Sequence, residues 1–337
     1  MAGYTKKRKS NDPSYKRNKR RKGMMEPSVT VLTYEMPTSQ VGVTRYIDLF
    51  SDLSAINRKL HRQGQLLFVQ GITVTDDVAI ADPNQALDVL IRVAGNTWST
   101  HNAWTKGKAL WDEMNQEVLE DNPSVQGKWA DYKVRLDETM AGANTIKALD
   151  GASGAYPAGE WNYSTYVLPE HDVTPGTGVV LPAEEWTAHL CGPDDAAAFR
   201  VGLINAYEQS RATVFEEAPN VPAALPASFY LKLTDDGSQD PELAAVIADA
   251  NERAPYSMTA GDYPGSGGFT PAESLTQVCR NVKNAFTPTM DMPGFLAPCG
   301  LVQVNAARAA AVTDNVRLHI YVSAGPSRGI LAAPMGQ

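Results

Sequence analysis

Lysine and arginine residues crowd into two short clusters near the start of the chain. The first cluster covers residues 6–9, the second covers residues 16–22, and a polar spacer that contains Pro13 separates them. A dense run of like charges repels itself and is stabilised by a polyanion, because condensed counterions are released when Lys and Arg replace them. The clusters therefore predict a nucleic-acid-binding segment. The residues expected to bind are Lys6, Lys7, Arg8, Lys9, Lys16, Arg17, Lys19, Arg20, Arg21 and Lys22.

Two basic clusters with a spacer between them are also typical of a bipartite nuclear import signal. Import receptors would then contact Lys6, Lys7, Arg8, Lys9, Lys19, Arg20, Arg21 and Lys22. Tyr4 and Tyr15 lie beside the clusters, where their rings could stack on unpaired bases. The alternative interpretation is a solvated tail that only keeps the protein soluble.

The charge of this segment contrasts with the charge of the rest of the chain. Residues 1–22 contain ten Lys and Arg and one acid, a net charge of +9, whereas residues 24–337 contain 20 Lys and Arg against 37 acids, a net charge of −17. Residues 1–23 contain no Leu, Ile, Val or Phe, so they cannot bury enough apolar surface to offset the entropy of ordering. We therefore expect a disordered basic arm, residues 1–23, and a folded acidic body, residues 24–337.

The body shows no arrangement of residues typical of catalysis. The nucleophile motif G-x-S-x-G and the zinc motif H-E-x-x-H are absent. His189 and Cys191 form a close pair of possible metal ligands, but no third ligand lies near them in the sequence. Together with Cys279 and Cys299, Cys191 suits buried positions in a reducing compartment better than a disulfide framework. The sequence predicts no enzyme, no cofactor and no metal site.

Pairs of adjacent acids could bind calcium at subunit contacts, although such pairs are more typical of solvated turns. They lie at residues 76–77, 184–185, 194–195, 216–217 and 235–236. Neither a secretory signal nor a membrane-spanning segment is expected, since no apolar core follows the basic clusters and no apolar run approaches the length of a spanning helix.

Alternation of apolar and polar residues predicts that the body is mostly β-strand. The expected strands cover residues 29–36, 41–49, 66–74, 87–93, 161–167, 199–207, 211–216, 229–234, 301–305 and 316–322. Helices are expected at residues 53–61, 102–120 and 241–253, and long loops at 121–160 and 254–294. Because strand and helix do not alternate, the pattern favours an antiparallel, all-β sandwich with long loops and a few short helices.

Three stretches of the chain, together with the arm, resemble the capsid proteins of circular, Rep-encoding single-stranded DNA viruses, in particular the stool-associated group. The arm carries KKRK and KRNKRRK, as the Lys- and Arg-rich N-termini of those proteins do in kind. GFLAPCGLVQVNA and NVRLHIYVSAGPSRGILAAPMGQ look like their last two strands and closing tail. IRVAGNTWSTHNAWTKGKALWDEMN looks like the helix-bearing insertion that follows an early strand.

The resemblance implies a single eight-stranded jelly roll, of which sixty copies form a T=1 icosahedral shell around single-stranded DNA. The arm would face inward on the DNA and, before assembly, recruit nuclear import receptors. The body would form the shell, its loops would make subunit contacts, and an unidentified host-cell receptor would bind the exterior. The protein would be found in the virion and, during assembly, in the host nucleus.

Two other classes of protein remain open. A cellular nucleic-acid-binding protein with a basic tail is the first, although such a protein usually carries a basic face on its folded domain as well. A carbohydrate-binding or hydrolytic jelly roll is the second, with tryptophans as a sugar platform. Three of the six tryptophans, Trp98, Trp104 and Trp111, cluster around one expected helix and favour a core position instead.

Overall fold

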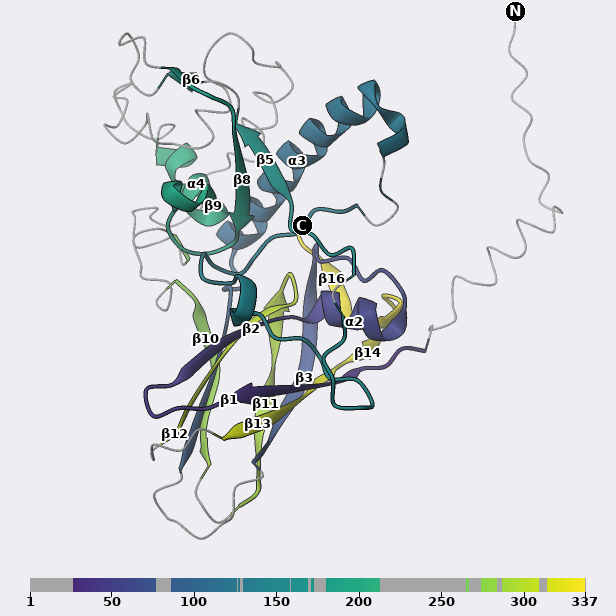
Figure 1. Ribbon diagram of the computed structural model, residues 1–337, viewed down its shortest axis with the longest axis vertical. Coiled ribbons are helices and arrows are strands. Elements are labelled where there is room, and N and C mark those ends of the chain that lie inside the picture. The colour runs from purple at the N-terminus through teal and green to yellow at the C-terminus, as the bar shows by residue number, and fades with distance from the viewer. Residues whose placement is uncertain are drawn as a thin grey trace, which may run out of the picture.

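A computed structural model gives the arrangement of most of the body (Figure 1). The structure describes residues 27–76, 86–125, 127, 130–157, 159–168, 171–172, 180–212, 265–266, 274–283, 287–308 and 314–336. Three expected elements lie wholly or mostly outside these ranges. They are the strand at 229–234, the helix at 241–253 and most of the strand at 211–216.

Two four-stranded antiparallel ladders form the centre of the molecule. The first sheet has the order β1 (Val31–Pro37), β13 (Asn315–Val322), β3 (Gln65–Asp76) and β11 (Thr289–Pro298), and β16 (Ala332–Pro334) also pairs with β3. The second has the order β10 (Thr276–Lys283), β4 (Leu87–Val93), β12 (Leu301–Arg308) and β2 (Val43–Asp48). Every pairing in both sheets is antiparallel.

The pairing of these strands follows one rule. Counted along the chain, the first strand pairs with the eighth, the second with the seventh, the third with the sixth and the fourth with the fifth. This is one long antiparallel ribbon, folded back on itself and rolled until its two sheets face each other, which is the jelly-roll arrangement. The expected antiparallel jelly-roll sandwich is confirmed.

Apolar side chains fill the space between the two sheets. In β1 the residues Leu32, Tyr34 and Met36 are fully buried, and in β13 every second residue from Val316 to Val322 is buried. Successive side chains of a strand point to opposite faces, so strict alternation places one face of each strand in the core. Each buried Leu or Ile contributes about 1.5–3 kcal/mol relative to an exposed position.

A second layer of structure lies between β4 and β10 in the chain and at one end of the sandwich (Figure 1). It contains α3 (Trp98–Asp121), α4 (Leu203–Ala212) and a small sheet in which β8 (Glu184–His189) pairs antiparallel with β5 (Thr165–Leu168) and parallel with β9 (Arg200–Gly202). These elements share a hydrophobic cluster, which includes Trp104, Tyr132 and Tyr166 and extends to the sandwich strands β2, β3 and β12. Thr97 caps α3 by accepting a hydrogen bond from the backbone N–H of Thr100 (3.3 Å).

The remaining elements are short. The helix α2 (Leu49–Asn57) follows β2 directly, with Asp48 as its N-cap. Single 3₁₀ turns lie at η1 (Pro123–Val125), η2 (Gly142–Asn144) and η3 (Ala196–Ala198), and two-residue strand pairs form between β6 (His171–Asp172) and β7 (Val180–Leu181) and between β14 (Ala324–Gly325) and β15 (Gly329–Ile330).

Several expected elements need correction. The strand expected at 199–207 is β9 for three residues and then the helix α4, whose buried residues 203, 204, 206 and 207 recur with helical spacing. The helix expected at 53–61 begins at Leu49 and ends at Asn57. The strand expected at 161–167 begins only at Thr165. β8 and β10 were not expected, and β11 begins within the loop expected at 254–294.

Candidate nucleic-acid interface

All ten basic residues expected to bind nucleic acid lie in the first 26 residues, outside the described part of the chain. The structure therefore does not place Lys6, Lys7, Arg8, Lys9, Lys16, Arg17, Lys19, Arg20, Arg21 or Lys22. It does place the point at which the described chain begins, residues 27–30, against the end of α2. This point fixes where the basic segment joins the body.

The junction is held by hydrogen bonds to the end of α2 and the residues after it. Asn57 accepts from the backbone N–H of Val29 (2.6 Å) and donates to the carbonyl oxygen of Val29 (3.1 Å). The Lys59 ammonium donates to the carbonyl oxygen of Pro27 (2.9 Å). An asparagine that bonds both backbone groups of one residue replaces a missing strand partner, so the chain leaves the body from a defined place.

Two exposed arginines lie at the same junction. Arg58 is the C-cap of α2, and Arg328 receives a hydrogen bond at its carbonyl oxygen from the Ser28 hydroxyl (2.7 Å). Both have a positive φ of 52°, in the left-handed region that costs a non-glycine residue about 1–2 kcal/mol. Arg328 also donates to the carbonyl oxygen of Leu60, whereas Arg58 has no hydrogen-bond or ion-pair partner among the described residues.

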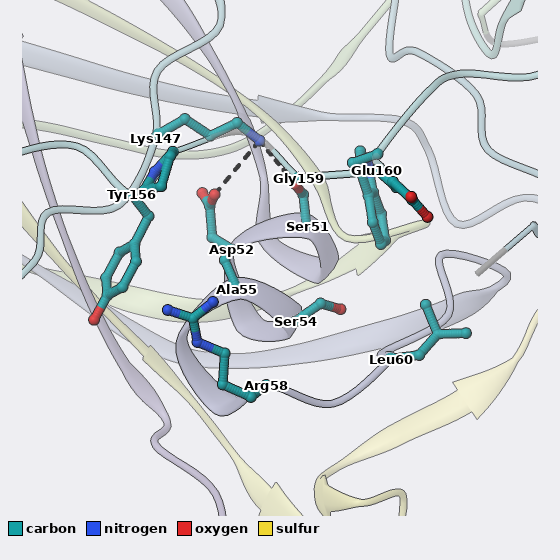
Figure 2. A pocket seen from close by; sticks show the side chains of 12 residues that line it. Ser51, Asp52, Ser54, Ala55, Arg58, Leu60, Lys147, Tyr156, Gly159 and Glu160 are labelled. Carbon is teal, nitrogen blue, oxygen red and sulfur yellow. Dashed lines mark hydrogen bonds and ion pairs between the residues drawn. The ribbon is translucent and has the colours of Figure 1, made fainter. Parts of the chain in front are cut away.

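A cavity of about 330 Å³ opens beside α2 and next to this junction (Figure 2). The helix and its C-cap contribute Ser51, Asp52 and Arg58 to its wall, and the segment from 147 to 161 contributes Lys147, Tyr156 and Trp161. That segment belongs to the long loop expected at 121–160, which is positioned by backbone pairing such as Tyr156 N–H to the carbonyl oxygen of Ala148 (2.9 Å). The loop thus forms one wall of a built cavity.

Asp48 organises the base of this region. Its carboxylate accepts hydrogen bonds from the backbone N–H of Ser51 (3.1 Å), the indole N–H of Trp161 (2.8 Å) and the Tyr163 hydroxyl (3.3 Å). Burial raises the pKa of Asp48, although these hydrogen bonds and the charge of Lys147 oppose the shift. Asp48 therefore ties the start of α2 to the loop across the cavity.

Asp52 and Lys147 meet inside the cavity (Figure 2). The Asp52 carboxylate accepts from the Tyr34 hydroxyl (2.9 Å) and lies 3.6 Å from the Lys147 ammonium, which donates to the Ser51 hydroxyl (2.7 Å). Burial raises the pKa of Asp52 to about 7 against the opposing effect of Lys147. The Asp52 Oδ1 atom has no hydrogen-bond partner in the described structure.

A serine bonded to a lysine is also the arrangement of some hydrolases, in which a neutral lysine takes the serine proton. In this cavity the Lys147 Nζ atom also lies 3.6 Å from the Asp52 carboxylate. Ser51 is moreover inside the first turn of α2. The cavity offers hydrogen-bonding groups and aromatic rings to a ligand.

Comparison of the chain with protein-family models, with curated proteins and with solved structures finds no match. Among the helices of the described ranges, none is both long and apolar enough to span a membrane.

Within the described ranges, the fold brings no third metal ligand to the His189 and Cys191 pair. No group of three or more His, Cys, Asp or Glu residues that could hold a metal lies in the described ranges. His189 is buried, and its Nε2 atom lies 2.9 Å from the carbonyl oxygen of Pro193. Burial lowers the pKa of His189 to about 4 and raises the pKa of the Cys191 thiol well above its usual range. Cys191, Cys279 and Cys299 are all buried and unbridged, as expected.

The acidic pairs have structural roles where the structure describes them. Asp76 is buried and ion-paired, so it is not part of a solvated turn. Asp194 accepts from the backbone N–H of Gly202 (2.8 Å), and Glu184 accepts from the Trp186 indole (2.9 Å). Asp77 and the pairs at 216–217 and 235–236 lie outside the described residues.

Sequence reasoning missed the residues of the cavity. Asp48 carried a local signal, because an Asp directly before an apolar helical run is a typical N-cap. Asp52 and Lys147 carried no such signal in the sequence. They are 95 positions apart in the chain, and only the fold brings them together.

Proposed function

We propose that this chain is a structural capsid protein, which assembles into a small icosahedral shell and packages single-stranded DNA through its basic arm. The observation that supports this most strongly is the joining of two opposite parts, a segment of charge +9 and an acidic jelly-roll body of charge −17. A shell built from the body alone would repel DNA, so the arm supplies the attraction. In this proposal the residues act by binding, without catalysis or a cofactor.

The proposal is tested by purifying the full-length protein and imaging it in negative stain. Closed particles of uniform size are expected, and their absorbance at 260 nm relative to 280 nm should be raised by captured nucleic acid. Replacement of all ten arm Lys and Arg by Ala is the matched comparison and should remove the captured nucleic acid. A protein that binds DNA but never forms particles would instead favour the cellular nucleic-acid-binding class.

Salt dependence tests the arm itself. Affinity for a single strand should fall with salt with a log–log slope of about −0.7 for each contacted phosphate. Replacing Lys19, Arg20, Arg21 and Lys22 by Ala should therefore reduce the slope by up to about 3. An unchanged slope would show that these cations do not contact phosphate.

We also propose that the arm directs the protein to the nucleus. A fluorescent reporter fused to residues 1–23 should accumulate in nuclei, and replacing either cluster by Ala should weaken the accumulation, because import receptors bind spaced basic clusters as separate contacts. A reporter that stays in the cytoplasm would leave the arm with packaging alone.

A further inference from the structure

The surroundings of the arm junction differ from the rest of the acidic body. Arg58, Lys59 and Arg328 gather where the described chain begins, and Lys147 extends the cationic group into the cavity. The body as a whole carries 37 acids against 20 cations. Cations are therefore concentrated beside the start of the arm. A nucleic-acid strand bound by the arm would first meet the body at this place.

The cavity has the size and lining for one planar ring system. Its volume of about 330 Å³ is at the small end of ligand sites, which run from about 300 to 1,000 Å³. Tyr156 and Trp161 supply aromatic rings, and Ser51, Asp52 and Lys147 supply hydrogen-bonding groups. The Lys133 ammonium lies 4.9 Å from the Trp161 ring centroid, so that ring is already in contact with a cation.

The polar atoms of the cavity are only partly satisfied. Asp52 Oδ1 is buried without a hydrogen-bond partner, and the exposed Arg58 guanidinium has no partner among the described residues. Arg58 holds a strained left-handed conformation in a position that glycine usually takes. A buried carboxylate oxygen with only the Lys147 ammonium near it, at 3.6 Å, and a cation without a described partner at the cavity edge fit a ligand that carries donors on a flat ring and an anion outside it.

We propose that this cavity binds one nucleotide of single-stranded DNA, with the base against Tyr156 and Trp161 and the phosphate at Arg58. The inference rests on the proposed packaging function and assigns a site on the body in addition to the arm. A single strand turns a base out into such a cavity at a lower cost than a duplex does, since duplex bases are stacked and paired. The acids of the cavity do not prevent nucleotide binding. The Asp52 carboxylate is engaged by Tyr34 and Lys147. Glu160 is exposed and lies across the view from Tyr156 and Arg58 in Figure 2.

Photocrosslinking of the full-length protein locates the bound base directly. An oligothymidine that carries 5-iodouracil is irradiated with the protein, and crosslinked peptides are mapped by mass spectrometry. We expect crosslinks at Tyr156 or Trp161 in addition to any in the arm. Crosslinks confined to the arm would overturn the inference. The wild-type protein is used, so this outcome does not depend on the folding of a variant.

Affinity measurements with full-length variants separate stacking from charge. Tyr156→Ala should weaken binding about five-fold or more with an unchanged salt slope, because stacking is not ionic. Arg58→Ala should reduce the slope by about 0.7, for one phosphate contact. Arg62→Ala is the control, because Arg62 carries the same charge on the same loop but is paired with Asp131 (3.0 Å) outside the cavity. This variant should change neither the affinity nor the salt slope.

The outcomes distinguish this inference from the proposed function. If the arm variant at residues 19–22 weakens binding while Tyr156→Ala and Arg58→Ala match wild type, the cavity site is wrong and packaging by the arm stands. If none of the variants changes binding, the packaging proposal fails as well. Should Tyr156→Ala unfold the protein, as thermal unfolding would show, Tyr156→Leu keeps an apolar side chain without the aromatic ring and should still weaken binding.

Discussion

Asp52 is a carboxyl group whose protonation is set by burial. The folded protein holds its pKa at about 7, whereas an Asp in an unfolded chain titrates near about 3.9. The folded state therefore binds this proton more tightly than the unfolded state does. By linkage, the contribution of Asp52 to stability is fully present below about pH 4 and is lost as the pH rises through about 7.

The first prediction compares wild type with Asp52→Asn, which cannot titrate. Between pH 5 and pH 8 the melting temperature of wild type should fall relative to that of the variant, because only wild type must release the buried proton. Thermal unfolding at pH 5, 6, 7 and 8 measures the difference. His189, whose pKa is lowered to about 4, titrates in both proteins and cancels in the comparison. A difference that is constant across this range would contradict the raised pKa.

At the scale of the elements, a buried ion triad joins the two sheets. Asp76 ends β3, and its carboxylate contacts Lys283 (2.7 Å), which ends β10, and Arg308 (3.0 Å), which ends β12. Arg308 also donates to the Thr38 hydroxyl (3.2 Å). All three charged side chains are at most 4% exposed, so the buried charge of each must be compensated by the opposite charge of its partners.

The second prediction is that Asp76→Ala lowers the free energy of unfolding by about 3–5 kcal/mol, since it leaves two buried cations without their carboxylate. Asp88→Ala is the control, because Asp88 pairs with Arg280 between strands β4 and β10 but on the exposed surface. It should cost about 1 kcal/mol or less. Urea denaturation measures both, and equal losses would show that burial of the triad is not what stabilises it.

The helix α3 is packed closely at its single glycine. A Cβ atom at Gly107 would lie 2.8 Å from the Tyr132 hydroxyl and 2.9 Å from a methyl group of Leu203 in α4. The Tyr166 hydroxyl also donates to the carbonyl oxygen of Gly107 (2.7 Å). The absent side chain therefore lets the helix approach the small sheet and α4.

The third prediction is that Gly107→Ala has the opposite of the usual effect of a Gly→Ala substitution in a helix. In an exposed helix Gly→Ala stabilises by about 0.5–1 kcal/mol, but Gly107→Ala should destabilise by about 1–3 kcal/mol because the methyl group overpacks the cluster. Gln116→Ala, at an exposed position of the same helix, should stay within about 0.5 kcal/mol of wild type. Chemical denaturation measures the stability of both variants. A loss of stability in Gly107→Ala alone indicates close packing, whereas no loss would mean that a cavity accepts the methyl group.

For the whole molecule, the described fold lies within residues 27–336, and residues 1–22 have a net charge of +9. The contacts that anchor the start of the described chain lie at residues 27–29, beyond the end of the arm. Removal of residues 1–23 therefore keeps the residues that make this anchor.

The fourth prediction follows from this division. Deletion of residues 1–23 should leave the thermal unfolding temperature nearly unchanged, because the deleted segment has no Leu, Ile, Val or Phe with which to pack into a core. The deleted form should give empty particles or small oligomers with a low ratio of absorbance at 260 nm to 280 nm, whereas full-length protein captures nucleic acid. Unfolding of the deleted form would place the arm within the structural core and move the boundary at Gly23.

Strands whose burial alternates along the chain were predictable from local residue patterns alone. In β13, Val316, Leu318 and Ile320 alternate with exposed residues, and this period is visible without any knowledge of partners. The strand β11 was hidden, because Pro293 and Gly294 interrupt it and are typical of turns. The run 199–207 was taken for a strand, because a short apolar run has no clear period and packing against α3 makes most of it helical.

The order of the strands and the cavity could not be predicted before folding was known, because both depend on contacts between distant residues. Strand pairs such as β1 with β13 join residues almost 300 positions apart, and no local pattern specifies such a partner. The Asp52–Lys147 pair and the position of Arg58 beside Tyr156 arise in the same way, from α2 and a distant loop that pack together. Charge and periodicity are properties of neighbouring residues and can be read along the chain. A cavity is formed by surfaces that meet only after folding.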